Sequence, residues 1–145
     1  MAKILIIDDD ESVRDMLQQW LESKGHEIVE AADGEAGVTL FNELFSQDPV
    51  ELVIVDAEMP KQNGLDVIQE LVVDFPGVKI IAITGSSGEA AQALRINATT
   101  FGAYCVFLKP LLLQDLLETI ERLLSNTHAQ DLPLRQLRKT GYSTS

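Results

Sequence analysis

The sequence has 145 residues, a length that fits one ordinary domain built around a single core. Hydrophobic residues make up 46% of it and charged residues 23%, close to average globular usage, which excludes intrinsic disorder over most of the chain. The 11 basic residues against 23 acidic ones give a net charge of -12, the wrong sign for direct binding to a nucleic-acid backbone.

The chain shows no signal for a membrane or for an oxidising compartment. No apolar run approaches the roughly 20 residues that cross a bilayer, so we expect neither a membrane span nor a signal peptide. The single cysteine, Cys105, cannot form an intramolecular disulfide. We therefore expect a cytoplasmic protein.

The first part of the chain alternates short apolar runs with helical stripes. Residues 3–8 and 26–31 have the apolar character of buried strands. Gly25 stands where a left-handed helix cap is expected, and Asp33 is a candidate N-cap. The apolar positions that repeat at helical spacing are Val13, Met16, Leu17, Trp20 and Leu21, then Leu40, Phe41, Leu44 and Phe45.

The same alternation continues to about residue 124. Strands are predicted over 51–56, 78–84 and 104–108, and Pro76-Gly77 ends the helix before the second of these. A weaker helix is predicted over about 89–98. The other two helical stripes are Val67, Ile68, Leu71 and Val72, then Leu113, Leu116, Leu117, Ile120 and Leu124. Five βα units predict a doubly wound α/β domain, with a parallel sheet covered by helices on both faces.

Beyond about residue 125 the periodicity fades. We expect a domain over 1–124 and a tail or linker over 125–145. The tail carries Arg135, Arg138 and Lys139 against Asp131, too few basic residues for a DNA-binding arm. A short partner helix is the alternative.

Polar side chains gather where the predicted strands end. Asp8, Asp9 and Asp56 follow two strands, and Thr84 and Lys109 follow two others. Ligands bind at this edge in open α/β sheets. Carboxylates brought together would repel each other by several kcal/mol per pair, which a hard cation such as Mg²⁺ would offset. Thr84 and Lys109 could then hold phosphoryl oxygens while a carboxylate attacks in line.

Each residue taken alone also has a plain structural interpretation. An acidic run before a helix can simply interact with the helix dipole. Thr84 could be a turn residue, and Lys109 could be a solvated loop lysine. What favours a site is that all of them fall at the same end of different strands.

Four stretches carry a family resemblance: ILIIDDDESVRDML, LVIVDAEMPKQNGLDVI, IIAITG and GAYCVFLKP. They resemble, in order and spacing, the signature stretches of the receiver domain of bacterial two-component response regulators, over about residues 2–124. The resemblance implies a flavodoxin-like (βα)5 fold with five parallel strands in the order 2-1-3-4-5.

The resemblance also implies roles for single residues. Asp56 matches the phosphoacceptor, which takes a phosphoryl group from a phosphohistidine on a sensor histidine kinase or phosphotransfer protein. Asp9 and Asp56 match direct Mg²⁺ ligands, Asp8 a ligand through water, and Glu58 a ligand through its backbone carbonyl. Thr84 and Lys109 match the hydroxyl and the ammonium that bind the phosphoryl oxygens.

The loop after Asp56 adds two expectations. Gly64 matches a position where glycine would permit a backbone turn that other residues resist. The Glu58 side chain is either solvated or a gate that alters how water reaches the phosphoaspartate.

Two departures from the family pattern concern the switch. Val106 stands where the family usually has Tyr or Phe, so the usual aromatic switch is not expected, although Tyr104 could report the state of Thr84 by another route. The stretch 84–102 is longer than the family pattern by about three residues.

The resemblance favours a receiver that catalyses only its own phosphorylation and dephosphorylation and then changes its affinity for a partner. One alternative is a receiver-like interaction module that works without phosphorylation. Another is a Mg²⁺-dependent phosphohydrolase with an aspartyl-phosphate intermediate, for which Glu58 has the spacing of a second acid. Expected partners are the kinase or phosphotransfer protein, an output protein or an output domain outside this sequence, and a second copy packed on the last helix.

Overall fold

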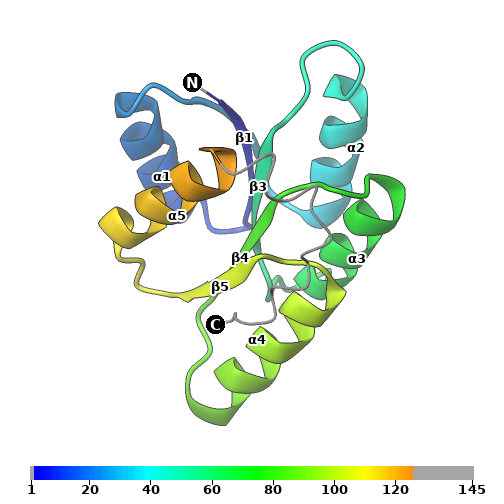
Figure 1. The fold of residues 1–145 in the computed structure, drawn as a ribbon. Coiled ribbons are helices and arrows are strands. Elements are labelled where there is room, and N and C mark those ends of the chain that lie inside the picture. The colour runs from blue at the N-terminus through cyan, green and yellow to red at the C-terminus, as the bar shows by residue number, and fades with distance from the viewer. Residues whose placement is uncertain (1, 126–145) are drawn as a thin grey trace.

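The computed structural model describes residues 2–125, in which five strands alternate with five helices (Figure 1). The strands are β1 (Lys3–Ile7), β2 (Glu27–Ala31), β3 (Leu52–Asp56), β4 (Ile80–Thr84) and β5 (Cys105–Leu108). The helices are α1 (Glu11–Ser23), α2 (Gly34–Leu44), α3 (Gly64–Asp74), α4 (Gly88–Phe101) and α5 (Leu113–Ser125).

All five strands form one parallel sheet in the order β2-β1-β3-β4-β5. The predicted doubly wound fold and the strand order implied by the resemblance are both confirmed. The winding reverses between β1 and β3, so the loops that follow these two strands lie side by side at one edge of the sheet.

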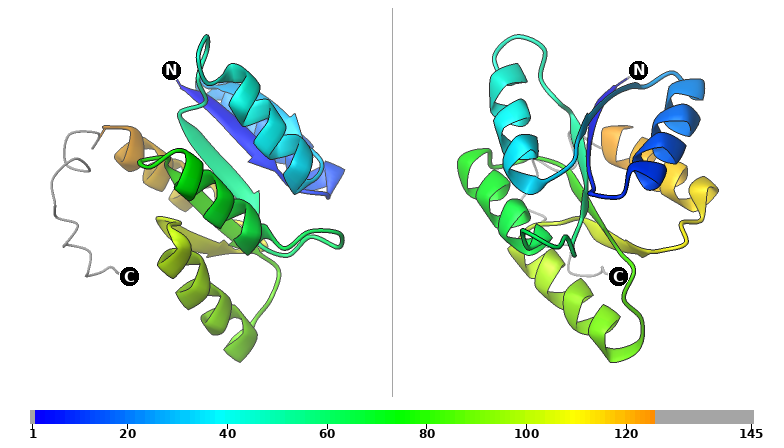
Figure 2. Two further views of the ribbon diagram at one scale, coloured as in Figure 1. Left: turned by 90° about the vertical axis from the view of Figure 1, so that its right-hand side faces the viewer. Right: turned by 180° about the vertical axis from the view of Figure 1, so that it is seen from behind.

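Helices cover both faces of the sheet, and successive strand residues point alternately into two cores. Helices α2, α3 and α4 lie on one face, as the left view of Figure 2 shows, and α1 and α5 lie on the other. The first core includes Leu5, Ile7, Val53, Val55, Phe41, Ile68 and Leu71. The second includes Ile4, Ile6, Leu52, Ile54, Leu17, Leu21, Leu116 and Ile120. Burial on both faces explains why the strands have continuous apolar runs.

Local side chains set where the helices begin and end. The carboxylates of Asp10 and Asp33 accept backbone N–H bonds at the starts of α1 and α2, and Asn63 does the same for α3. Gly25 follows α1 with a φ of +94°, in the left-handed region predicted for it. Helix α4 extends to Phe101, about one turn further than its weak apolar stripe predicts.

Two residues assigned to buried helix faces are exposed. Met16 is 40% exposed on α1, and Phe45 is 51% exposed just past the end of α2. The Phe45 ring packs against Phe75, with ring centroids 4.6 Å apart, and so bridges α2 and α3 at the surface. Among residues 2–125, no helix is long and apolar enough to span a membrane. The predicted tail lies outside the described residues from position 126 onward.

Candidate functional site

Three carboxylates converge at the carboxyl ends of β1 and β3. Asp8 and Asp9 follow β1, Asp56 is the last residue of β3, and one oxygen from each lies within 4.8 Å of the other two. Asp8 is fully buried, Asp56 is 3% exposed and Asp9 is exposed. The neighbouring Asp10 does not belong to this acidic cluster, because its carboxylate accepts the Ser12 N–H and caps α1.

Lys109, which follows β5, links the two buried carboxylates. Its Nζ lies 3.2 Å from Asp8 Oδ2 and 3.1 Å from Asp56 Oδ2. An ammonium between two buried carboxylates offsets part of their mutual repulsion. The strand-end residues Asp8, Asp9, Asp56 and Lys109 are thus together, as the sequence predicts from their positions.

These surroundings shift the pKa values of the charged groups. Burial raises the pKa of Asp56 from 3.8 to about 6, and the Asp8 charge adds to the rise, while the Glu58 N–H and Lys109 oppose it. Burial alone would lower the pKa of Lys109, but its hydrogen bond to Asp56 and the charges of Asp56 and Asp8 raise it above its ordinary value. Lys109 therefore stays charged at neutral pH.

Backbone and side-chain hydrogen bonds fix the orientation of the two buried carboxylates. The Asp10 N–H donates to Asp8 Oδ1 at 2.9 Å, and the Glu58 N–H donates to Asp56 Oδ1 at 2.8 Å. Arg14 Nη1 also donates to the Asp8 backbone carbonyl at 2.7 Å, while its Nε is paired with Glu30 on β2 at 3.1 Å. Arg14 was missed by the sequence reasoning, since no local pattern connects α1 to a carbonyl six residues earlier.

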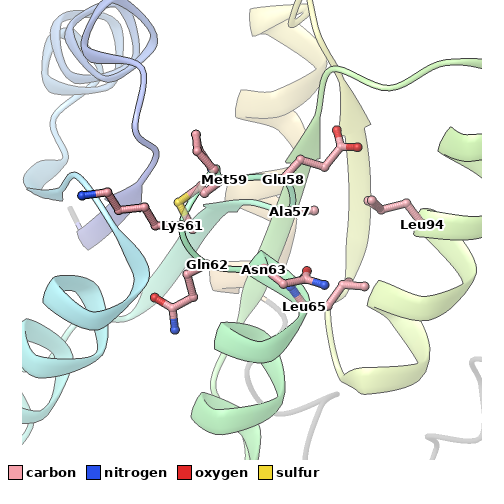
Figure 3. Close-up of a pocket in the computed structure, with 9 residues that line it drawn as sticks. Ala57, Glu58, Met59, Lys61, Gln62, Asn63, Leu65 and Leu94 are labelled. Carbon is pink, nitrogen blue, oxygen red and sulfur yellow. The ribbon is translucent and has the colours of Figure 1, made fainter.

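Thr84 and Glu58 are joined in a way that the sequence did not predict. Thr84 is fully buried at the end of β4, and its Oγ1 donates to Glu58 Oε1 at 2.5 Å. The Ser86 hydroxyl donates to Glu58 Oε2. Figure 3 shows the Glu58 side chain leaving the loop after β3 in a direction different from that of Lys61. These hydrogen bonds lower the pKa of Glu58, that from Ser86 most. The Glu58 side chain is exposed, but both of its carboxylate oxygens have hydroxyl partners.

Close backbone packing shapes the loop that follows β3. Glu58 and Asn63 form an isolated antiparallel bridge, which closes this loop and holds the Glu58 backbone beside Asp56. A Cβ on Gly64 would lie 2.2 Å from the Asp56 carbonyl oxygen and 2.5 Å from Ala57 Cα. The predicted reason for this glycine was therefore wrong: close approach to the end of β3 requires it, not a special turn, since its φ lies outside the left-handed region.

Val106 and Tyr104 occupy places unlike that of an aromatic switch beside Thr84. Val106 is partly buried against the core under α2, α3 and α4. Tyr104 precedes β5 and is 50% exposed, and its N–H donates to the Ile80 carbonyl at the beginning of β4. Because Thr84 ends the same strand, Tyr104 lies at the opposite edge of the sheet from the acidic cluster. Direct contact between Tyr104 and Thr84 is absent.

The acidic cluster fits a divalent cation. The buried Asp8 Oδ2 lacks a hydrogen bond within residues 2–125, although Lys109 is near it, and three carboxylate oxygens within 4.8 Å of each other form a hard oxygen donor set. Mg²⁺ prefers such ligands and keeps several waters. The exposed carboxylate of Asp9 leaves one side of the cluster accessible from solvent.

Comparison with known proteins identifies the fold and its relatives. Residues 4–121 match the model of the response regulator receiver domain. A probable transcriptional regulator ycf27 from Cyanophora paradoxa is 36% identical over 127 residues, which cover 86% of this chain and 49% of that protein. The chain spans about half the length of the curated relatives it matches.

Solved structures agree with this assignment. A response regulator receiver domain protein from Clostridium thermocellum superposes with a TM-score of 0.79 and 29% identity, covering 89% of this chain and 98% of that one. The beryllofluoride-activated NtrC4 receiver domain dimer gives a TM-score of 0.77 and 26% identity, covering 88% and 99% respectively.

Proposed function

This chain belongs to the response regulator receiver domain family, and from that premise we propose that it is a phosphoacceptor of a two-component or phosphorelay system. Asp56 takes a phosphoryl group from a phosphohistidine on a sensor histidine kinase or phosphotransfer protein. The observation that carries this proposal is the Asp56 carboxylate, paired with Lys109 at 3.1 Å and grouped with Asp8 and Asp9. If these four residues had separate structural roles, such as interaction with a helix dipole or a place in a solvated loop, they would have no reason to lie together.

The chemistry is an in-line displacement at phosphorus. An Asp56 carboxylate oxygen attacks, a new O–P bond gives an acyl phosphate, and the P–N bond to the donor imidazole breaks. Lys109 and Thr84 bind the equatorial phosphoryl oxygens, and backbone hydrogen bonds keep Asp8 and Asp56 in place. With a pKa of about 6, Asp56 is mostly ionised at neutral pH, as a nucleophile must be.

Mg²⁺ is the proposed cofactor. Asp9 and Asp56 would bind it directly, Asp8 through water and Glu58 through its backbone carbonyl. Bound there, the cation would neutralise charge on the phosphoryl oxygens. The proposal is supported by the close carboxylates and by Asp8 Oδ2, which has an ion pair with Lys109 but no hydrogen bond within residues 2–125.

The two alternatives have less support. An interaction module without phosphorylation gains nothing from gathering buried carboxylates that repel one another, which costs stability. A phosphohydrolase would need Glu58 as a second acid, but both oxygens of its carboxylate accept hydrogen bonds from Thr84 and Ser86. Receiver domains are typically signalling modules rather than enzymes acting on separate substrates.

The output and the cellular setting extend the proposal. We place the chain in the cytoplasm, where it would meet its kinase. It would act on an output protein, or on an output domain outside this sequence, by protein contact and not by direct nucleic-acid binding, given its net charge of -12. A second copy is a further candidate partner, since a related receiver domain has been solved as a dimer.

Phosphorylation by a small donor tests the proposal. Incubation with acetyl phosphate and Mg²⁺ should add the mass of one phosphoryl group to the wild-type chain, and chelation of Mg²⁺ should prevent the addition. Asp56→Asn is the matched control and should show no gain. No gain in the wild type, or an equal gain in Asp56→Asn, contradicts the proposal.

A further inference from the structure

The Glu58 carboxylate clamps two hydroxyl groups from another part of the chain. Glu58 belongs to the loop after β3, whereas Thr84 and Ser86 lie 26 and 28 positions later, at and beyond the end of β4. Each carboxylate oxygen accepts one hydroxyl: Oε1 from Thr84 at 2.5 Å, and Oε2 from Ser86. The clamp therefore connects the loops that follow β3 and β4.

The clamp uses the only proton that Thr84 can donate. A threonine hydroxyl has one O–H donor and two acceptor positions. In this structure the donor is directed to Glu58, and one acceptor position receives the Ser86 N–H at 3.0 Å. Thr84 is fully buried, so its hydroxyl has no solvent partner to exchange with. Thr84 cannot donate to a phosphoryl oxygen until its bond to Glu58 breaks.

The bond to Glu58 is stronger than an ordinary hydroxyl contact. The acceptor is a carboxylate on an exposed side chain, held by a hydroxyl at each oxygen, and hydrogen bonds to ionised groups are roughly twice as strong as neutral ones. The Glu58 backbone is also fixed, because its N–H donates to Asp56 Oδ1 at 2.8 Å and it bridges Asn63. The carboxylate is thus presented to Thr84 from a rigid loop.

We propose that Glu58 is a positioning residue that holds Thr84 in the unphosphorylated arrangement, so that the phosphoryl group on Asp56 must compete with Glu58 for the Thr84 proton. This inference rests on the proposed function, in which Thr84 binds a phosphoryl oxygen. The Glu58 side chain thereby sets the equilibrium between Thr84 bonded to Glu58 and Thr84 bonded to the phosphoryl group. Removing the carboxylate then favours the phosphorylated arrangement.

Beryllofluoride, which mimics a phosphoryl group, provides the test. The full chain with saturating Mg²⁺ is titrated with beryllofluoride, and binding is followed by the ¹H–¹⁵N signals of the protein, including the Ser86 amide. Glu58→Ala should bind the mimic about tenfold more tightly than the wild type, a change of about 1.4 kcal/mol. Ser86→Ala removes only one arm of the clamp and should give a smaller gain. Glu58 is exposed, so its truncation leaves the core intact, which thermal unfolding checks.

A double-mutant cycle separates the clamp from a general charge effect. In a Thr84→Val background the hydroxyl is absent, so Glu58→Ala should leave affinity for the mimic unchanged. A full gain in that background would show that Glu58 acts by charge alone and would overturn the inference. An unchanged affinity in Glu58→Ala itself would also overturn it, while the proposed function stands. Failure of the wild type to bind the mimic at all would instead count against the proposed function.

Discussion

Asp56→Asn should stabilise the metal-free protein, because the native Asp56 carboxylate is buried beside Asp8. The asparagine oxygen can still accept the Glu58 N–H, and Lys109 keeps its ion pair with Asp8 at 3.2 Å. The substitution therefore removes an unfavourable buried charge and leaves Lys109 paired with Asp8, while the asparagine Nδ2 replaces the Oδ2 that faced Lys109.

The pKa shift sets the size of this effect. Folding raises the pKa of Asp56 from 3.8 to about 6, which corresponds to about 3 kcal/mol at 1.36 kcal/mol per pKa unit. Because the carboxyl pKa is raised in the folded protein, the charge of Asp56 does not affect the free energy of unfolding below pH 3.8. It lowers that free energy as the pH rises from 3.8 toward 6, and above pH 6 the full loss is present. Asp56→Asn should then raise the melting temperature by about 6 to 12 °C at pH 7.5, and by far less at pH 4, where the cost falls to about 0.5 kcal/mol.

Thermal unfolding in EDTA, followed by circular dichroism at both pH values, measures this difference. Asp15→Asn is the matched control, because Asp15 is exposed on α1 and its removal should change stability by less than about 0.5 kcal/mol. Adding Mg²⁺ should stabilise the wild type more than Asp56→Asn and so reduce the difference between their melting temperatures. The reasoning fails if Asp56→Asn is no more stable than the wild type at pH 7.5, or if Asp15→Asn gains as much.

Two further predictions concern packing and burial. Gly64→Ala should destabilise the fold by about 2 to 3 kcal/mol in a urea titration, because its Cβ would lie 2.2 Å from a backbone oxygen of Asp56. The control is Gly85→Ala, where a Cβ meets nothing within 4 Å, and it should be nearly neutral. Equal losses of stability in the two variants would argue against the close approach. Burial raises the pKa of Cys105 from 9.0 to about 12. Because the thiolate is the nucleophile, alkylation by iodoacetamide at pH 8 should be about a thousandfold slower in the native protein than in urea. Native and urea rates within tenfold of each other would contradict the burial of Cys105.

Local patterns were enough to predict most of the architecture. Continuous apolar runs and 3.6-residue stripes gave five strands and five helices, because burial on two faces or one face leaves a direct trace in the order of residues. Caps act over two or three positions, so Asp33 and Gly25 could be assigned without the fold. The end of α4 was predicted about one turn too early, because a helix that buries only Ala91 and Ala98 has a weak hydrophobic pattern.

Within the site, sequence alone could also place Asp8, Asp9, Asp56 and Lys109 together. The ends of parallel strands must meet at one edge of the sheet, so residue type and position at a strand end sufficed. Residue type and strand order are therefore enough to predict the acidic cluster and its lysine.

Only the tertiary structure decided what the neighbouring side chains contact. The hydrogen bonds from Thr84 and Ser86 to Glu58 join residues 26 and 28 positions apart, and the spacing of residues along a chain carries no record of which rotamers meet across two loops. The tight fit of Gly64 against Asp56 is likewise invisible in sequence, because it depends on how closely α3 packs on β3. Periodicity reports which face of an element is buried, whereas hydrogen-bond partners are selected by distances of a few tenths of an ångström between elements that meet only after folding.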